Sequence, residues 1–261
     1  MDIYSYFTGQ YHYGDLPVQL CQEKRQSLSL VALDQIEQAI QLNATSLLQC
    51  VLSPAEQGYF QRFQYMKRKK EWLGGRIAAK AAMLTFSRAS DNQKLNSITI
   101  LPNKHGRPIA EKVPACLSAQ GSELIISLSH SDCFAVGLAR LTRKGASCGV
   151  DLQKISTKLA GLTSHFATDE ELQLLAKQAD CDEDIRLTML WTAKEALKKA
   201  LLHDQSVIFS ATELQEIALV SDSIRRFTCT VQGQCHSVLV HTLSPYILSI
   251  TEEKTGEHDH A

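Results

Sequence analysis

Two side chains with oxygen donors, Asp151 and Gln153, stand two positions apart in the segment of residues 149–155. Alternate residues of a strand face the same side, so these two share one face and Val150 and Leu152 share the other. Mg²⁺ prefers oxygen ligands and usually keeps waters and substrate phosphates. With a carboxylate supplied from elsewhere, the pair would therefore suit a Mg²⁺ site. The alternative is an aspartate that caps a turn at a strand end.

Residues 191–200 have the pattern of an amphipathic helix with a charged face. The apolar stripe comprises Leu190, Ala193, Ala196, Leu197, Ala200 and Leu201, and the charged side comprises Lys194, Glu195, Lys198 and Lys199. Trp191 falls among the charges, which indicates a second surface to cover, such as a neighbouring lobe, a ligand or a partner. The alternative is a solvated face with an ion pair between Glu195 and Lys199.

A histidine follows an apolar strand pattern at residues 123–129. Ser129 and Ser131 flank His130, and we expect a hairpin turn there that leaves backbone N–H groups free to bind an anion. The alternative is a histidine at a hairpin tip that makes one local hydrogen bond.

A basic run at residues 67–70 is followed by Arg76 and Lys80 and could reach several phosphates. A solvated charge run is the alternative. The formal net charge of −1 gives no global attraction to nucleic acid or to anionic membranes, so any anion binding must be local.

The remaining patterns predict helices and antiparallel strands in both halves. We expect a helix at residues 53–88 that starts at a capping box and is weakened at Gly74 and Gly75, a strand at 97–101 before a turn at 102–106, and a hairpin of 123–129 with 134–140. Residues 144–147 are the expected linker. Beyond it we expect a strand at 148–152, helices at 168–177 and 185–202, and strands at 224–231, 237–241 and 246–251. This divides the chain into lobes of residues 1–144 and 145–261, with a polar tail at 252–261.

The composition indicates an ordinary globular protein of one or two lobes. Its 261 residues are 44% hydrophobic and 21% charged. Eight cysteines lack CxxC spacing, which predicts reduced thiols and no zinc site. No basic leader and no apolar run of about 20 residues is present, so the sequence predicts a cytoplasmic protein without a membrane segment.

Five segments taken in order resemble the larger, two-lobed 4′-phosphopantetheinyl transferases of the surfactin-synthetase-activating type. They are WLGGRIAAK at residues 72–80, GRP at 106–108, SLSH at 127–130, GVD at 149–151 and WTAKEALKK at 191–199. The resemblance implies two similar α+β lobes related by a pseudo-twofold axis, each with an antiparallel sheet and a long helix. It also implies that coenzyme A binds in the cleft between them.

The resemblance implies roles for three charged residues. Asp151 and Glu195 would bind Mg²⁺, with Mn²⁺ as a substitute, at the diphosphate of coenzyme A. Glu195 would also be the base for the carrier serine, and Lys199 would neutralise charge on the diphosphate. Many relatives have an acidic residue in place of Gln153, so we expect its amide oxygen to ligate the metal or to hold a metal-bound water.

Further residues match positions that hold coenzyme A in the family. Ser129 and His130 would lie near the 3′-phosphate, and the turn of residues 103–108 near the adenine and phosphates. The full coenzyme-binding set that the resemblance implies is Lys67, Arg76, Gly106, Arg107, Pro108, Ser129, His130, Lys194 and Lys199.

The implied partner is an apo acyl or peptidyl carrier protein, which the enzyme would convert to its holo form as a monomer with pseudo-dimeric lobes. Lys154, Lys158 and Arg186 are expected docking contacts, because carrier surfaces are typically acidic. The alternative function is a catalytically silent module that binds coenzyme A or a carrier protein. Such a module would be expected to lack at least one of His130, Asp151, Glu195 and Lys199.

Overall fold

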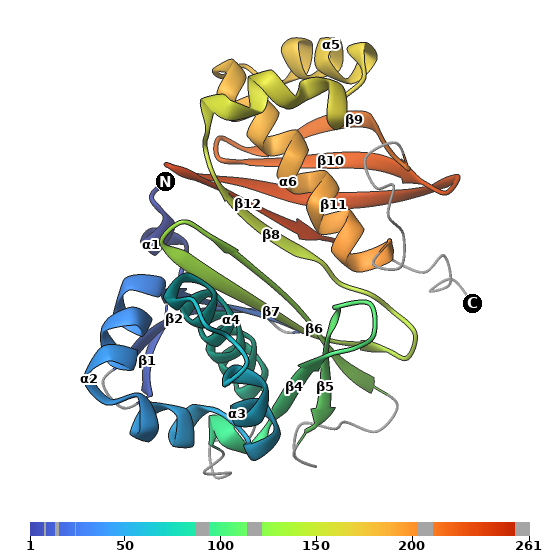
Figure 1. Ribbon diagram of the computed structural model, residues 1–261. Helices are drawn as coiled ribbons and strands as arrows, with labels where there is room; N and C mark the ends of the chain where they lie inside the picture. Colours follow the sequence, from blue (N-terminus) through green and yellow to red (C-terminus); the bar gives the residue numbers. More distant parts are fainter. Residues whose placement is uncertain are drawn as a thin grey trace. The chain divides into compact units, whose positions relative to one another are not determined.

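The computed structural model describes residues 1–7, 9–13, 16–23, 25–86, 94–113, 122–202 and 211–253. The chain divides into two compact units, an N-terminal unit of residues 2–146 and a C-terminal unit of residues 147–261 together with Met1. Each unit combines an antiparallel sheet with a long helix (Figure 1), which confirms the expected α+β class.

The N-terminal unit is built on a five-stranded antiparallel sheet of order β1-β2-β3-β7-β6. Its strands are β1 (Gly9–Tyr13), β2 (Leu16–Gln22), β3 (Gln26–Ala32), β6 (Ser122–Ser131) and β7 (Phe134–Arg143). The predicted hairpin is present as β6 and β7, which turn at Asp132 with φ of 47°. A separate two-stranded sheet pairs β4 (Thr99–Pro102) with β5 (Pro108–Lys112).

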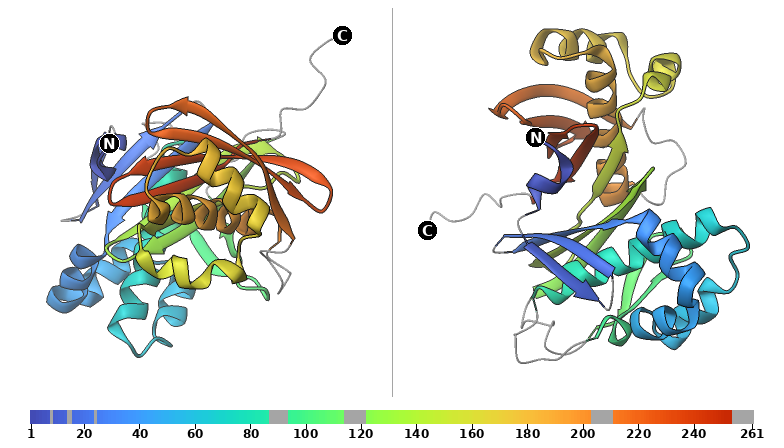
Figure 2. Two further views of the ribbon diagram at one scale, coloured as in Figure 1. Left: turned by 90° about the horizontal axis from the view of Figure 1, so that it is seen from above. Right: turned by 90° about the vertical axis from the view of Figure 1, so that its left-hand side faces the viewer.

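A long helix, α4 (Met66–Leu84), covers this sheet against β3, β6 and β7, and α2 (Leu33–Val51) packs beside it (Figure 2). The unit also contains α1 (Ile3–Tyr6), α3 (Pro54–Phe60) and η1 (Leu95–Ser97). At Gly74 an added Cβ would lie 2.6 Å from Leu33 Cδ2, so the glycine permits the close packing of α2 on α4.

The prediction of a single helix at residues 53–88 is wrong, because the helix is interrupted between Phe60 and Met66. The break allows Phe60 and Phe63 to pack against Trp72, with ring centroids 6.0 and 5.6 Å away. Burial of this aromatic cluster favours two helices over one straight helix. Residues 87 and 88 lie outside the described residues.

The C-terminal unit has one five-stranded antiparallel sheet of order β8-β12-β11-β10-β9. Its strands are β8 (Val150–Lys154), β9 (Thr212–Ser221), β10 (Ile224–Val231), β11 (Gln234–Leu243) and β12 (Tyr246–Thr251). The helical segments are η3 (Thr157–His165), α5 (Asp169–Gln178) and α6 (Glu183–Leu201), and α6 packs on β8, β11 and β12. β10 and β12 have the predicted bounds, whereas β9 was not predicted.

The apolar stripe predicted for residues 190–201 faces the core of this unit. Leu190, Ala193 and Leu197 are buried with Phe227 and Val240 of the sheet. The capping box predicted at Thr168 is also present and starts α5. These local signals therefore predicted both the start of α5 and the buried face of α6 correctly.

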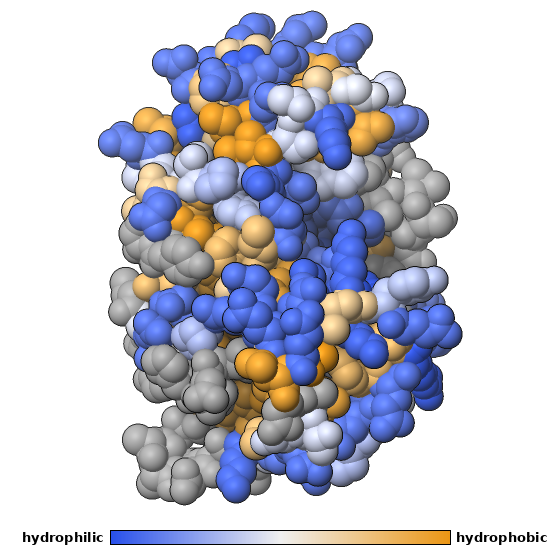
Figure 3. Space-filling model, turned by 60° about the vertical axis from the view of Figure 1, so that its left-hand side comes forward, coloured by the Kyte–Doolittle hydropathy of each residue, from blue (hydrophilic) through white to orange (hydrophobic). Residues whose placement is uncertain are grey.

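No helix among the described residues is long and apolar enough to cross a membrane. On the face drawn in Figure 3, hydrophobic side chains form patches between hydrophilic ones. Residues 254–261 of the expected polar tail lie outside the described residues.

The reactivity of the cysteine thiols tests the packing of the C-terminal core. The seven described cysteines form no disulfide, and Cys116 lies outside the described residues. Burial raises the pKa of Cys229 from 9.0 to about 12, which lowers its thiolate fraction roughly 10³-fold. We expect iodoacetamide at mildly alkaline pH to label exposed Cys235 and to spare Cys229, as read by peptide mass spectrometry. Equal labelling of both thiols in the native protein would contradict this packing, and equal labelling in denaturant is the control.

Candidate active site

The candidate site lies where the start of β8 meets the middle of α6. Gly149 precedes β8, and a Cβ added there would lie 1.9 Å from the Ala196 carbonyl oxygen and 3.1 Å from the Ala200 nitrogen. No side chain fits in that space, so only glycine permits this approach of strand to helix. The Gly149 N–H also donates to Thr251 Oγ1 over 2.9 Å, which fixes it against the end of β12.

Gly149→Ala should therefore destabilise the C-terminal unit, because backbone atoms of α6 would have to move. We expect a loss of at least about 2 kcal/mol in the free energy of unfolding, measured by urea denaturation. Gly161→Ala in η3 is the matched control, since an added Cβ there meets nothing within 4 Å. The control should change stability by no more than about 0.5 kcal/mol. Equal midpoints for the two variants would refute the close approach.

Asp151 of β8 and Lys199 of α6 form the central contact of the site. The Lys199 ammonium lies 2.6 Å from Asp151 Oδ1 and donates to the Val150 carbonyl oxygen over 3.1 Å. The Asp151 side chain is 9% exposed and that of Lys199 is 27% exposed. A carboxylate and an ammonium thus meet at a partly open surface, where a ligand could reach both.

Glu195 lies on the same face of α6 as this contact. Thr192 Oγ1 is hydrogen-bonded to Ser249 Oγ at 2.7 Å, and Ser249 is the cross-strand partner of Asp151. Glu195 is three residues after Thr192 and four before Lys199, so helical geometry aligns all three along β8 and β12. Two carboxylates and one ammonium therefore share one surface.

The Glu195–Lys199 ion pair of the alternative interpretation is not formed. Glu195 Oε1 instead lies 3.2 Å from the ammonium of Lys198, and Lys199 forms an ion pair with Asp151. The pairing on α6 is decided by the strand beside it, because Asp151 offers Lys199 a less exposed carboxylate than Glu195 does.

Gln153 follows Asp151 on the same side of β8, as alternation predicted. It is partly exposed, and its amide nitrogen donates to the neighbouring Lys154 carbonyl oxygen over 3.3 Å. Since the amide uses its nitrogen in that bond, its oxygen remains available as an acceptor.

The donors at this site suit a hard divalent cation. Among the described residues, no group of three or more His, Cys, Asp or Glu could hold a metal ion by itself. Two carboxylates with an amide oxygen form a smaller set, of the kind that Mg²⁺ completes with waters and substrate phosphates. Asp151, Glu195 and Gln153 could therefore hold Mg²⁺, with an anionic substrate and waters supplying the remaining ligands.

Lys194 does not belong to this surface, which corrects its expected coenzyme-binding role. Its side chain is 2% exposed, and its ammonium lies 2.7 Å from Glu171 Oε1. A buried ammonium held by a carboxylate is not available to a ligand on the exposed face. The sequence signal for Glu171 was its place in the capping box, which revealed its backbone contacts but not its pairing with Lys194.

Trp191 packs within the C-terminal unit. Its ring lies edge-on to Phe166, with centroids 5.3 Å apart and planes at 87°. This contact joins α6 to the end of η3, so the second surface that Trp191 covers here belongs to its own unit, whereas the sequence predicted a neighbouring lobe, a ligand or a partner.

In the N-terminal unit, His130 and Ser129 do not form a free turn. Both lie within β6, where His130 pairs with Ala135 and Ser129 with Val136 of β7. Successive strand residues point to opposite faces, so their side chains diverge. His130 Nδ1 lies 4.0 Å from Glu71 Oε1 of α4, whereas Ser129 is buried. The expected joint contact of both side chains with one phosphate is therefore disfavoured.

The basic run on α4 is split between solvent and core. Lys67 is exposed and available to an anion, whereas Arg76 and Lys80 are buried. Arg76 stacks 4.4 Å from the Trp72 ring centroid and donates to the Ile100 carbonyl oxygen. Burial lowers its pKa to about 10. The structure thus makes Arg76 part of the core and corrects its expected role as a surface ligand.

The GRP segment forms the turn between β4 and β5. Asn103 Oδ1 accepts from the N–H groups of His105 and Arg107 at 2.9 and 3.0 Å, and Gly106 adopts φ of 83°. The positive φ explains the glycine, and Pro108 begins β5. The turn is ordered by its own hydrogen bonds, and Gly106 at its tip is exposed.

The comparisons with known proteins fall on the C-terminal unit. Residues 147–251 match the model of the family described as the 4′-phosphopantetheinyl transferase superfamily. A curated relative, the holo-[acyl-carrier-protein] synthase of Staphylococcus haemolyticus (strain JCSC1435), is 25% identical over 122 residues. These cover 45% of this chain and 94% of the relative.

Solved structures give matches of similar extent. A holo-(acyl-carrier-protein) synthase from Bacillus anthracis str. Ames, solved in complex with CoA (3′,5′-ADP), is 20% identical with a TM-score of 0.39, covering 46% of this chain and 96% of that one. The holo-ACP-synthase of Plasmodium yoelii is 18% identical with a TM-score of 0.39, covering 46% and 95%. The matched family model spans the β8 strand and the α6 helix that carry the candidate site. The C-terminal unit is thus similar to the 4′-phosphopantetheinyl transferase superfamily over residues 147–251.

Proposed function

We propose that this protein transfers the 4′-phosphopantetheine group of coenzyme A to a serine of an apo carrier protein, in a Mg²⁺-dependent reaction. The observation that carries the proposal is the contact of Lys199 with Asp151 on the face of α6 that also bears Glu195. This cluster lies inside the segment that matches the superfamily. The relative from Staphylococcus haemolyticus is named for making a holo carrier protein, which supports the same reaction here.

The reaction requires the groups that the site presents. The serine oxygen attacks the phosphorus that bears the pantetheine arm, and the bond from that phosphorus to 3′,5′-adenosine bisphosphate breaks. Glu195 accepts the serine proton, since its carboxylate is partly exposed and lies on the ligand-accessible face. Lys199 stabilises the negative charge that builds on the diphosphate.

Mg²⁺, held by Asp151 and Glu195 with help from Gln153, would supply positive charge at the diphosphate when bound. Asp151 is paired with Lys199 in this structure. We propose that Lys199 gives up this contact when the diphosphate arrives, which frees the Asp151 carboxylate for its ligand role. Phosphoryl-type transfer depends on such positioning and electrostatics and needs no covalent nucleophile.

The release of 3′,5′-adenosine bisphosphate tests the proposal. The protein is incubated with coenzyme A and Mg²⁺, with and without each of several apo carrier proteins, and the nucleotide is measured by chromatography. We expect release only when an apo carrier is present. Binding of coenzyme A without release on any carrier, while a working transferase modifies the same carriers, would instead favour the catalytically silent module.

Gln153 gives a prediction on metal dependence. Gln153→Glu would add a third carboxylate beside Asp151, and we expect the Mg²⁺ concentration for half-maximal rate to fall by about threefold or more. Lys154→Gln on the next, outward-facing position is the matched control and should leave this concentration unchanged. An unchanged Mg²⁺ dependence of Gln153→Glu would count against a ligand role.

Contacts outside this cluster stay predictions. Lys154 and Lys158 are exposed and could meet an acidic carrier, whereas the guanidinium of Arg186 is already bound to the Cys181 carbonyl oxygen. For coenzyme A, exposed Lys67 and the turn at Gly106 remain the best candidates in the N-terminal unit. A cytoplasmic location and a monomeric state likewise stay predictions.

A further inference from the structure

A buried ion pair lies directly before Glu195 in α6. The Lys194 ammonium is 2.7 Å from Glu171 Oε1 and 2.8 Å from Oε2, so one lysine engages both carboxylate oxygens. The two side chains are 2% and 1% exposed. The pair is therefore almost wholly buried, and the small pocket of about 130 Å³ that it lines includes none of Asp151, Glu195 and Lys199.

The Glu171 carboxylate connects three elements. Its Oε2 also accepts from the Thr168 N–H at the start of α5 over 2.9 Å, and its Oε1 accepts from the Leu214 N–H of β9 over 2.8 Å. Through Lys194, the same carboxylate holds α6. One buried carboxylate thus links α5, β9 and α6.

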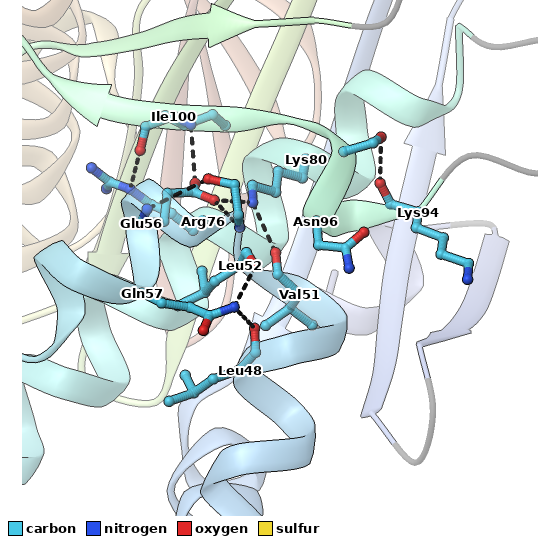
Figure 4. A network of polar contacts seen from close by, with 12 residues as sticks. Leu48, Val51, Leu52, Glu56, Gln57, Arg76, Lys80, Lys94, Asn96 and Ile100 are labelled. Carbon is cyan, nitrogen blue, oxygen red and sulfur yellow. Dashed lines mark hydrogen bonds and ion pairs between the residues drawn. The ribbon is translucent and has the colours of Figure 1, made fainter.

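The N-terminal unit contains the same arrangement. Glu56 is the capping-box residue of α3 and accepts from the Ser53 N–H at 2.8 Å, the Lys80 ammonium at 2.5 Å and the Ile100 N–H at 3.0 Å (Figure 4). In both units a buried lysine of the long helix meets a capping-box glutamate, which is bound in turn by a strand N–H.

The two pairs differ in the residues that come after the lysine along the helix. Lys194 is followed by Glu195 and, five residues on, by Lys199. At the same spacings from Lys80 stand Ala81 and Thr85, which carry no charge. The Glu171–Lys194 pair therefore lies beside the proposed catalytic groups, whereas the Glu56–Lys80 pair has no such neighbours on its helix. The Glu56–Lys80 pair can serve as an internal control.

Two further contacts set the position of α6 along the sheet. Thr192 bonds Ser249 of β12, and Ala196 lies against Gly149, on either side of Glu195. The buried pair adds a third restraint from α5 and β9 one residue from Glu195. Small displacements of catalytic groups reduce rates strongly, so a restraint at this place acts on the chemistry as well as on the fold.

We propose that Glu171 and Lys194 are positioning residues that hold Glu195 and Lys199 in place beside Asp151. This inference rests on the proposed transferase function. It replaces the coenzyme-binding role expected for Lys194, and it assigns the equivalent Glu56–Lys80 pair to the fold of the N-terminal unit alone.

The test compares two double variants, Glu171→Gln/Lys194→Met and Glu56→Gln/Lys80→Met. Replacing both partners leaves no unpaired buried charge. The single glutamine oxygen can accept from one of the two backbone N–H groups, and the loss of the other hydrogen bond is the same in both variants. Rates are measured on protein shown to be folded by circular dichroism, as kcat, KM for coenzyme A and the Mg²⁺ concentration for half-maximal rate.

We expect Glu171→Gln/Lys194→Met to lower kcat about tenfold or more and to raise the half-maximal Mg²⁺ concentration about threefold, with the KM for coenzyme A little changed. The Glu56→Gln/Lys80→Met variant should keep kcat and Mg²⁺ dependence within about twofold. Unchanged kcat and Mg²⁺ dependence in the first variant, or equal losses in both, would overturn the positioning role and leave a structural one.

Binding of Mn²⁺ alone, followed by electron paramagnetic resonance, separates this inference from the proposed function. If the wild-type protein modifies no carrier, the proposed function fails, yet weaker Mn²⁺ binding by Glu171→Gln/Lys194→Met than by the control variant would still support positioning. Equal Mn²⁺ affinity of the wild-type protein and both double variants would overturn it.

Discussion

If the proposed function is right, we expect Glu195→Gln to lower the rate of phosphopantetheine transfer by about 10³-fold and to leave the protein folded. Glutamine has nearly the same shape, and its oxygen can still accept from Lys198, so packing on α6 is conserved. In the proposed mechanism the variant lacks the proton acceptor and a negative ligand for the metal, and removal of either typically costs orders of magnitude in rate. The measurement is kcat with a saturating apo carrier at several Mg²⁺ concentrations.

The matched control for this prediction is Glu183→Gln in the first turn of the same helix. Glu183 is exposed and far along α6 from Asp151, so only a small loss of helix stability is expected, about 0.5 kcal/mol. A Glu195→Gln enzyme with more than a tenth of the wild-type kcat would exclude Glu195 as base and ligand together.

We expect Lys199→Met to lower kcat by about 10²-fold and Lys198→Met to lower it by no more than about threefold. The two lysines are neighbours with similar exposure, 27% and 32%, so general effects of charge removal are matched. They differ in partner, because Lys199 contacts Asp151 and Lys198 contacts Glu195. Only Lys199 is expected to meet the diphosphate as its charge increases.

The Lys199→Met variant should also bind Mn²⁺ at least as well as the wild-type protein, since Asp151 loses its competing ammonium. This gain separates a role toward the diphosphate from simple damage to the site. Equal rates of Lys198→Met and Lys199→Met, or weakened Mn²⁺ binding by Lys199→Met, would refute the assignment.

Much of the C-terminal unit could be predicted from local patterns. Alternation in β8 correctly placed Asp151 and Gln153 on one face, and the capping box at Thr168 located the start of α5. The apolar stripe of α6 identified its buried side. These features depend on residues that are close in sequence, so they can be predicted from the sequence alone.

The failures share a physical cause, which is a partner distant in sequence. Lys194 appears solvent-exposed on a helical wheel, yet Glu171 from another helix makes its burial possible. Lys199 selects Asp151 over Glu195 because β8 lies against α6. Arg76 and Lys80 appeared to belong to a surface run, but Trp72 and Glu56 hold them in the core. No local pattern specifies such pairings.

The measurement that tests the central claim most directly is the intact mass of an apo carrier protein after incubation with this protein, coenzyme A and Mg²⁺. The account predicts a mass gain of one phosphopantetheinyl group on a serine, lost when the metal is chelated, restored when Mg²⁺ is added back, and lost in Asp151→Asn. A mass gain that persists in both Asp151→Asn and Glu195→Gln, or no gain on any carrier that a working transferase modifies, would contradict it.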